Sequence, residues 1–200
     1  MDRIVATVNG HIILQSDWDE ALRCQAFEDG RSLDQLPSPE HKAALDRLID
    51  QELLREQMHS SDFQHASAQE VAQRMQDIRG QYAEASTPEG WRAVLFRGGL
   101  TEEELKQQVS HQLDLMRLVD ARLRPNVSVD SKSIESYYNQ QLLPQLRQSG
   151  AKEVPLAEVT PKIKELLTQQ QMDQLLVAWL QNLRSGSEIR GEGESKGELQ

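Results

Sequence analysis

Short strand patterns lie at both ends of a chain that otherwise has helical periodicity. Ile4–Val8 and His11–Leu14 flank Asn9-Gly10, the pair preferred in a type I′ hairpin turn because both central residues need a positive φ. Near the other end, Glu188-Ile189-Arg190 forms a third candidate strand. Because a two-stranded hairpin alone is marginally stable in water, we expect 188–190 to pair with Ile4–Val8. The sequence therefore predicts a mainly α fold, closed by a small β-sheet that joins its two ends.

Capping residues and proline mark the predicted helix starts between these strands. Ser67 with Glu70 and Thr101 with Glu104 have the spacing of capping boxes, and Pro144 is expected to end or kink the helix that contains it. Apolar residues at helical spacing then define the helices. We predict them from Ser16 to Glu28, Ser38 to Met58, Ser67 to Tyr82, Thr87 to Phe96, Thr101 to Leu123, Asp130 to Pro144 and Thr160 to Leu183.

Charge and composition exclude several classes of partner. The chain has 200 residues, with 22 Lys plus Arg against 32 Asp plus Glu, which gives a net charge of −10. This balance argues against binding to nucleic acid or to an anionic lipid surface, since both require basic residues. No apolar run approaches the roughly 20 residues that span a bilayer, so no integral membrane segment is expected.

The sequence contains no pattern typical of an enzyme. The histidines lack metal-ligand spacing, the lone Cys24 cannot form an internal disulfide, and neither a nucleophile elbow nor a nucleotide-binding glycine loop is present. We therefore predict no catalytic residue, no metal site and no cofactor.

One cluster of apolar residues stands out because aromatic residues make up only 4% of the chain. The predicted helix of about ten residues after Thr87 carries Trp91, Leu95 and Phe96. Packing in the core is the first interpretation of this cluster, and an exposed groove for polypeptide clients is the second. The candidate client-binding residues, chosen by their clustering along the chain, are Met75, Ile78, Tyr82, Trp91, Leu95 and Phe96.

Five motifs resemble those of the SurA-like chaperones and follow one another in that family's order. The resemblance covers about residues 3–190. The motifs are Val8-Asn9-Gly10 with Ile13–Asp17, Leu45–Leu54, Trp91 and Leu95 with Gly99–Leu105, Ile134–Asn139, and Pro155–Val159 followed by Ile163 and Leu167.

The chain departs from the family pattern between the last two motifs. SurA-like chaperones carry a parvulin prolyl-isomerase domain there, whereas this chain has only Gln140–Val154, a segment without histidine. The resemblance thus implies one chaperone domain over 1–190, with a linker at 140–155 and without isomerase activity. The polar residues 191–200 are expected to be a disordered tail.

The resemblance implies an ATP-independent chaperone of the periplasm or cell envelope that holds unfolded outer-membrane or secreted proteins without catalysis. Ile4–Val8 is too short for the apolar core of a signal peptide, so we expect such a signal to have been removed or to lie outside this sequence. The alternative is a dedicated scaffold or assembly protein that binds one folded partner or itself. The long terminal helix also permits a homodimer, formed in one version by domain swapping.

Overall fold

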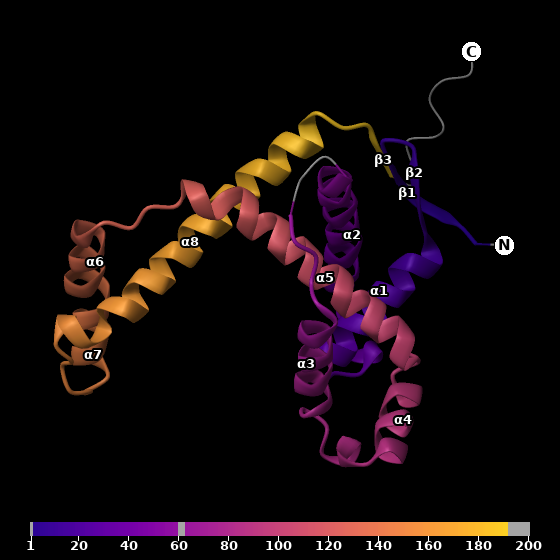
Figure 1. Ribbon diagram of the computed structural model, residues 1–200, viewed down its shortest axis with the longest axis horizontal. Helices are drawn as coiled ribbons and strands as arrows, with labels where there is room; N and C mark the ends of the chain where they lie inside the picture. The colour runs from indigo at the N-terminus through magenta and orange to yellow at the C-terminus, as the bar shows by residue number, and fades with distance from the viewer. Residues whose placement is uncertain (1, 60–62, 192–200) are drawn as a thin grey trace. The chain divides into compact units, whose positions relative to one another are not determined.

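The computed structural model describes residues 2–59 and 63–191, which form two compact units. Unit 1 comprises residues 1–118 and 182–200, and unit 2 comprises residues 119–181. Unit 1 contains β1 (Ile4–Val8), β2 (His11–Leu14), α1 (Gln15–Glu28), α2 (Ser38–His59), α3 (Ala68–Arg79), α4 (Pro88–Arg97), most of α5 (Glu102–Leu123) and β3 (Ile189–Gly191) (Figure 1). Unit 2 contains the end of α5, α6 (Ser131–Tyr137), α7 (Leu143–Gln148) and α8 (Leu156–Ser185) up to Gln181.

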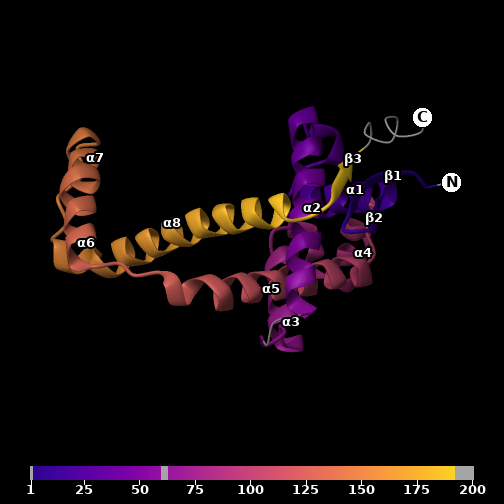
Figure 2. The ribbon, with the colours of Figure 1, turned by 90° about the horizontal axis from the view of Figure 1, so that it is seen from above.

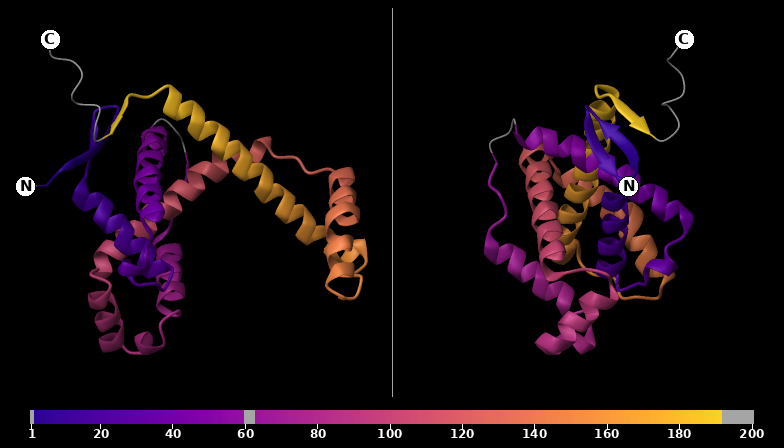
Figure 3. Two further views of the ribbon diagram at one scale, coloured as in Figure 1. Left: turned by 180° about the vertical axis from the view of Figure 1, so that it is seen from behind. Right: turned by 90° about the vertical axis from the view of Figure 1, so that its right-hand side faces the viewer.

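The three strands form one antiparallel sheet in the order β2-β1-β3 (Figure 3). The turn between β1 and β2 is made by Asn9 and Gly10 with φ values of 48° and 86°, as a type I′ turn requires. In the register between β1 and β3, Thr7 pairs with Arg190 and Val8 with Ile189. This confirms both the predicted fold class and the predicted pairing of the two chain ends.

Asn9 also connects the hairpin to the residues that precede β3. Its backbone N–H donates to the carbonyl of Glu188, and its Oδ1 accepts from the N–H of Glu188, both at 2.8 Å. Its Nδ2 donates to Glu56 of α2 at 2.7 Å and to Ser187 at 3.2 Å. One turn residue therefore joins β1, the C-terminal strand and α2 within unit 1.

A small core lies beneath the sheet and packs against α2. Its buried residues are Val5, Ala6, Val8, Ile13, Ile49 and Leu53, and the partly buried Leu183 and Ile189 pack against them. Arg184 strengthens this closure because its Nε donates to Asp50 Oδ1 at 2.6 Å. Residues from both ends of the chain thus share one core.

Most predicted helix starts are confirmed, and two are wrong, at Ser16 and at Thr160. The Ser67 side chain accepts from Glu70 N–H, and Thr87 and Asp130 cap α4 and α6 in the same way. The predicted start of the first helix at Ser16 is wrong, because α1 already begins at Gln15 and Ser16 does not cap it. The Ser16 hydroxyl instead donates to Asp2 Oδ2 at 2.5 Å.

Unit 2 is more continuously helical than the sequence predicted. Pro144 lies in the first turn of α7, which follows α6 through a π-helical segment, Tyr138–Leu142, and α6 and α7 run on as one column (Figure 2). The wider π turn accommodates the missing proline N–H without ending the helix. The first part of the predicted linker at 140–155 is therefore helical, up to Gln148. Only residues 149–155 of this linker lack helical structure.

The predicted start of the last helix at Thr160 is also wrong. This helix begins at Leu156 and contains Pro161 in its second turn. The Thr160 hydroxyl donates to the carbonyl of Leu156 at 2.8 Å, so Thr160 bonds within the helix rather than capping it.

The predicted domain and the predicted tail are not settled by the helices and strands of the two units. The single domain over 1–190 stays a prediction, and the predicted tail at 191–200 lies outside the described residues except for Gly191 in β3. No helix in the described ranges is long and apolar enough to cross a membrane.

Candidate functional site

The predicted client-binding residues lie in and around a second core of unit 1, formed by α1, α3, α4 and α5. Ile78, Trp91 and Leu95 are buried in it, with exposed fractions of 0%, 4% and 3%. Met75 and Tyr82 pack against its edge and are partly buried. The structure thus brings five of the six residues together, but three of them face the interior.

Phe96 differs from its neighbour Leu95 because it is 85% exposed. Trp91, Val94 and Leu95 follow the three- and four-residue spacing that places side chains on one helix face. Phe96 lies one residue beyond Leu95, which turns it about 100° away from that face. The core interpretation therefore holds for Trp91 and Leu95, whereas Phe96 is a large aromatic side chain in contact with solvent.

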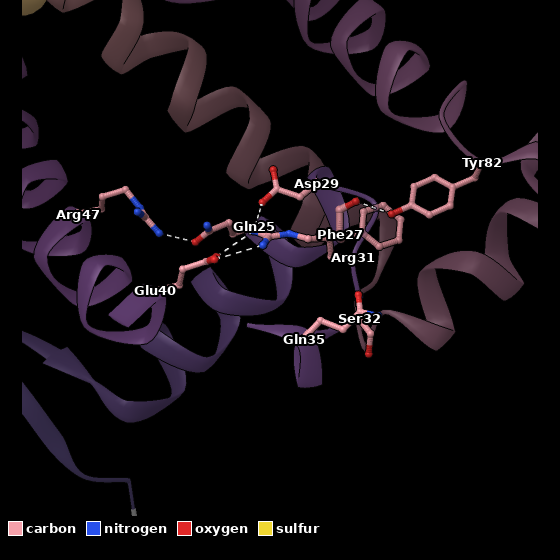
Figure 4. Close-up of polar contacts among 9 residues, drawn as sticks. All are labelled: Gln25, Phe27, Asp29, Arg31, Ser32, Gln35, Glu40, Arg47 and Tyr82. Atoms are coloured by element: carbon pink, nitrogen blue, oxygen red, sulfur yellow. Dashed lines mark hydrogen bonds and ion pairs between the residues drawn. The ribbon is translucent and has the colours of Figure 1, made fainter. Parts of the chain in front are cut away.

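Stacked rings anchor the centre of this core. The rings of Phe27 and Tyr82 stack with centroids 4.9 Å apart, and Trp91 packs on Phe27 at 5.8 Å. The Tyr82 hydroxyl donates to the carbonyl of Phe27 (Figure 4), and burial raises the pKa of Tyr82. The guanidinium of Arg79 lies 5.9 Å from the Trp91 ring, close enough for a cation–π attraction.

The first hollow on unit 1 is an open groove between α3, α4 and α5, which we call the α3–α5 groove. It has a volume of about 370 Å³. Met75 and Trp91 supply apolar surface in it, and Arg79, Lys106 and Glu102 supply charge. The groove thus contains two of the six predicted residues, one of them a methionine, whose flexible side chain adapts to different apolar partners.

The second hollow lies between α1, the loop that follows it and the end of α4, and we call it the α1–α4 pocket. Its volume is about 610 Å³. Its apolar wall includes Phe27, Leu33, Tyr82 and Val94, and its cations are Arg23, Arg31 and Arg97. The sequence did not predict this pocket, although the Gly98-Gly99 pair at its edge marks a close approach of two elements.

Two of the three arginines in the α1–α4 pocket are paired with carboxylates. Arg31 binds Glu40 at 2.9 Å and Asp29 at 2.7 Å (Figure 4), and Arg97 binds Glu84 at 3.1 Å. In the described part of the chain, Arg23 Nε is the buried side-chain polar atom without a hydrogen-bond partner.

Neither hollow contains groups arranged for catalysis or metal binding. No cluster of three or more His, Cys, Asp or Glu residues suits a metal ion within residues 2–59 and 63–191. Burial raises the pKa of the Cys24 thiol to about 12, so this thiol stays protonated and weakly nucleophilic at neutral pH.

Comparison with known proteins finds similarity to SurA-like chaperones. The family model for a SurA-like N-terminal domain matches residues 1–119. Chaperone SurA of Chromobacterium violaceum is 26% identical over 183 residues, which cover 88% of this chain and 39% of the relative. Chaperone SurA of Pseudomonas fluorescens is 22% identical over 139 residues, covering 68% of this chain and 32% of the relative. The matches thus span less than half of each relative's length.

A solved structure from Campylobacter jejuni shares the fold. It comes from work on the virulence factor PEB4 and the periplasmic protein Cj1289, two structurally related SurA-like chaperones. The superposition covers 95% of this chain and 99% of that chain, with a TM-score of 0.56 and 10% identity.

Proposed function

The chain belongs to the family of proteins with a SurA-like N-terminal domain, and from this premise we propose that it is an ATP-independent chaperone. It holds unfolded outer-membrane or secreted proteins in the periplasm through transient apolar contacts, without catalysis. The observation that carries the proposal is the α3–α5 groove, which lies wholly within the matched residues 1–119 and has Met75 and Trp91 in its wall.

Burial reduces the number of residues that we propose to contact clients. Met75 and Trp91 line the groove, and Phe96 offers an exposed ring on the adjoining helix α4. Ile78 and Leu95 lie in the core and support these positions from within. The proposed client contacts are therefore Met75 and Phe96, and Trp91 forms part of the groove wall.

Such contacts are suited to a chaperone that uses no energy source. Burial of apolar surface contributes about 25 cal/mol per Å², so one or two apolar side chains of a client bind weakly. The contacts are not directional, hence they accept many sequences. A client held in this way is released by dissociation alone.

The proposal predicts that the protein suppresses aggregation of an unfolded β-barrel protein diluted from denaturant, as measured by light scattering. Met75→Gln combined with Phe96→Ser removes apolar contact surface while leaving the buried core in place, so suppression should weaken. Met116→Ser is the control, since Met116 is also exposed, at 66%, but neither lines the α3–α5 groove nor belongs to α4. Unchanged suppression by the folded double variant would reject these contacts.

Trp91→Ala combined with Phe96→Ala would be a poorer test. The Trp91 side chain is 4% exposed and packs on Phe27. Its removal would leave a cavity in the core, at a cost of about 3–5 kcal/mol. Loss of holding in that variant would not separate binding from folding.

Two further measurements separate the alternatives. We expect no acceleration of prolyl isomerisation in a proline-containing peptide, and acceleration blocked by a parvulin inhibitor would contradict the non-catalytic proposal. Failure to protect several unrelated unfolded chains, together with one stoichiometric folded partner or a stable homodimer, would favour the scaffold hypothesis instead.

A further inference from the structure

We propose that the α1–α4 pocket binds a glutamate or aspartate side chain of an extended client, together with an adjacent apolar side chain. This inference rests on the proposed chaperone function and assigns a chemical preference to a second surface of unit 1. The α3–α5 groove has no part in it.

Arg23 supplies the first argument. This half-buried residue lines the pocket, and its Nε is covered from solvent without an acceptor. Its charge lowers the pKa of Glu104, but the Glu104 carboxylate accepts its hydrogen bonds from Thr101. A guanidinium has five N–H donors in a planar fork that matches a carboxylate. Arg23 therefore retains the capacity to bind an incoming acid.

The charge around the pocket supplies the second argument. The whole chain has a net charge of −10, which disfavours close approach of acidic segments elsewhere on its surface. In this pocket three arginines face two acids, Asp34 and Glu84. Arg31 and Arg97 are held by their own carboxylates, so Arg23 is the cation available to a client. Among the described residues that line the pocket, Arg23 is thus the arginine whose charge is not held in an ion pair.

The shape and the walls of the pocket supply the third argument. A volume of about 610 Å³ lies within the range of pockets that hold small ligands. A Cβ added at Gly98 would lie 2.6 Å from the Phe27 ring, and one at Gly99 would lie 3.3 Å from Arg23 Cδ. Because both residues lack side chains, the aromatic wall and the guanidinium stem approach the same backbone. An acidic side chain next to an apolar one fits this combination.

The test uses two fluorescent peptides with both ends blocked, which differ only in carrying Phe-Glu or Phe-Gln at the centre. We expect fluorescence anisotropy to show about tenfold tighter binding of the Phe-Glu peptide at low salt, a typical value for a charge-assisted hydrogen-bonded pair. The difference should shrink as salt screens the charges. Equal affinity for the two peptides at low salt would overturn the inference.

Variants assign the preference to the pocket. Arg23→Gln should reduce the tenfold ratio to about one, and Arg23→Lys should retain only part of it, because lysine keeps the charge but lacks the fork. Arg122→Gln is the control, since Arg122 is exposed and does not line the pocket, and it should keep the full ratio. Leu33→Ser should weaken both peptides equally. An Arg23→Gln protein that unfolds like wild type and keeps the ratio would contradict the assignment.

Two further arms separate this inference from its premise and from a related ligand. A Phe-Gln peptide with a free terminal carboxylate should bind no tighter than its blocked form, and a preference for that terminus alone would overturn the proposal of a side-chain acid. Peptide preference without suppression of aggregation would support the pocket and reject the chaperone function. Suppression of aggregation without peptide preference would support the chaperone function and reject the pocket.

Discussion

The two compact units bury their apolar residues to very different degrees. Every large side chain that is less than 2% exposed belongs to unit 1, where a sheet core and a helical core are both present. In unit 2 the buried apolar residues in the described part of the chain are Leu123, Ile134, Ile163 and Met172, each 3–7% exposed. The stability of unit 1 thus depends on packing between distant segments, whereas the stability of unit 2 depends more on hydrogen bonds within its helices. Elements with few buried contacts open locally at lower free energy, so we expect unit 2 to open first.

The largest expected effect comes from emptying the helical core of unit 1. Leu105 is 0% exposed in that core, so Leu105→Ala should lower the free energy of unfolding by about 3–5 kcal/mol, as cavity-forming changes do. The measurement is denaturant unfolding followed by circular dichroism. Leu166→Ala is the matched control in unit 2, because Leu166 is 40% exposed, and it should cost less than about 1 kcal/mol. Equal costs would remove the contrast between the units.

A smaller effect is expected where unit 1 joins the two ends of the chain. Asn9→Ala places a Cβ-bearing residue without a polar side chain at a φ of 48° and removes the bonds to Glu56 and Glu188. We expect a loss of about 2–3 kcal/mol. Asn9→Gly suits the turn but also lacks these bonds, so it should lose about 1 kcal/mol. Faster amide hydrogen exchange in β3 in both variants would place the loss at this connection, and unchanged exchange there would contradict it.

The same kind of change in unit 2 should act locally. Ile134 is the buried residue of α6, and Ile134→Ala should accelerate amide exchange in α6 and α7 while global unfolding changes by about 1–2 kcal/mol. Amides of α3 and α5 should be unaffected. A uniform acceleration throughout the chain would show that the two units unfold together, and the comparison between them would then fail.

The parts of the fold that the sequence predicted depend on residues close together in the chain. Asn9-Gly10 indicated the hairpin, and Ser67 and Thr101 indicated the helix starts, because each signal acts within four residues. Ile189 was placed beside β1 by a different argument, that a lone hairpin is unstable. Even local signals were ambiguous at Thr160-Pro161, where a pattern typical of a helix start lies inside α8.

The candidate site was less predictable because it depends on which face of a short helix packs inward. In α4, Leu95 and Phe96 are adjacent and both apolar, and only the packing of α4 against Phe27 of α1 distinguishes them. The α1–α4 pocket was also missed. Its arginines, Arg23 and Arg31 on one side and Arg97 on the other, come together only when α4 packs near α1. The ion pairs that distinguish Arg23 from the other two exist only after folding.

The smallest expected effect compares a capping carboxylate in each unit through pH. Glu70 of unit 1 accepts from the Ser67 hydroxyl and from Arg117 of α5, and these contacts lower its pKa from 4.5 to about 2. Because the pKa in the folded state lies below that of the unfolded state, the contribution is complete above about pH 4.5 and is lost as pH falls towards 2. We therefore expect Glu70→Gln to lower Tm at pH 7, and the gap from wild type to close between pH 4.5 and pH 2.

Asp130 of unit 2 is the matched case, because its pKa is also lowered, by hydrogen bonds from Ser133 of the same helix. It caps only α6, without a tie to another helix, and an asparagine side chain caps nearly as well. Asp130→Asn should therefore shift Tm at pH 7 less than Glu70→Gln. Because the pKa of Asp130 is lowered, the small gap from wild type should close as pH falls below about 3.8. Calorimetry of both variants from pH 7 to pH 2 makes the comparison. A larger Tm shift for Asp130→Asn than for Glu70→Gln would mean that α6 contributes to the cooperative unfolding of the whole chain. Unit 2 would then not be the less stable unit, despite its few buried residues.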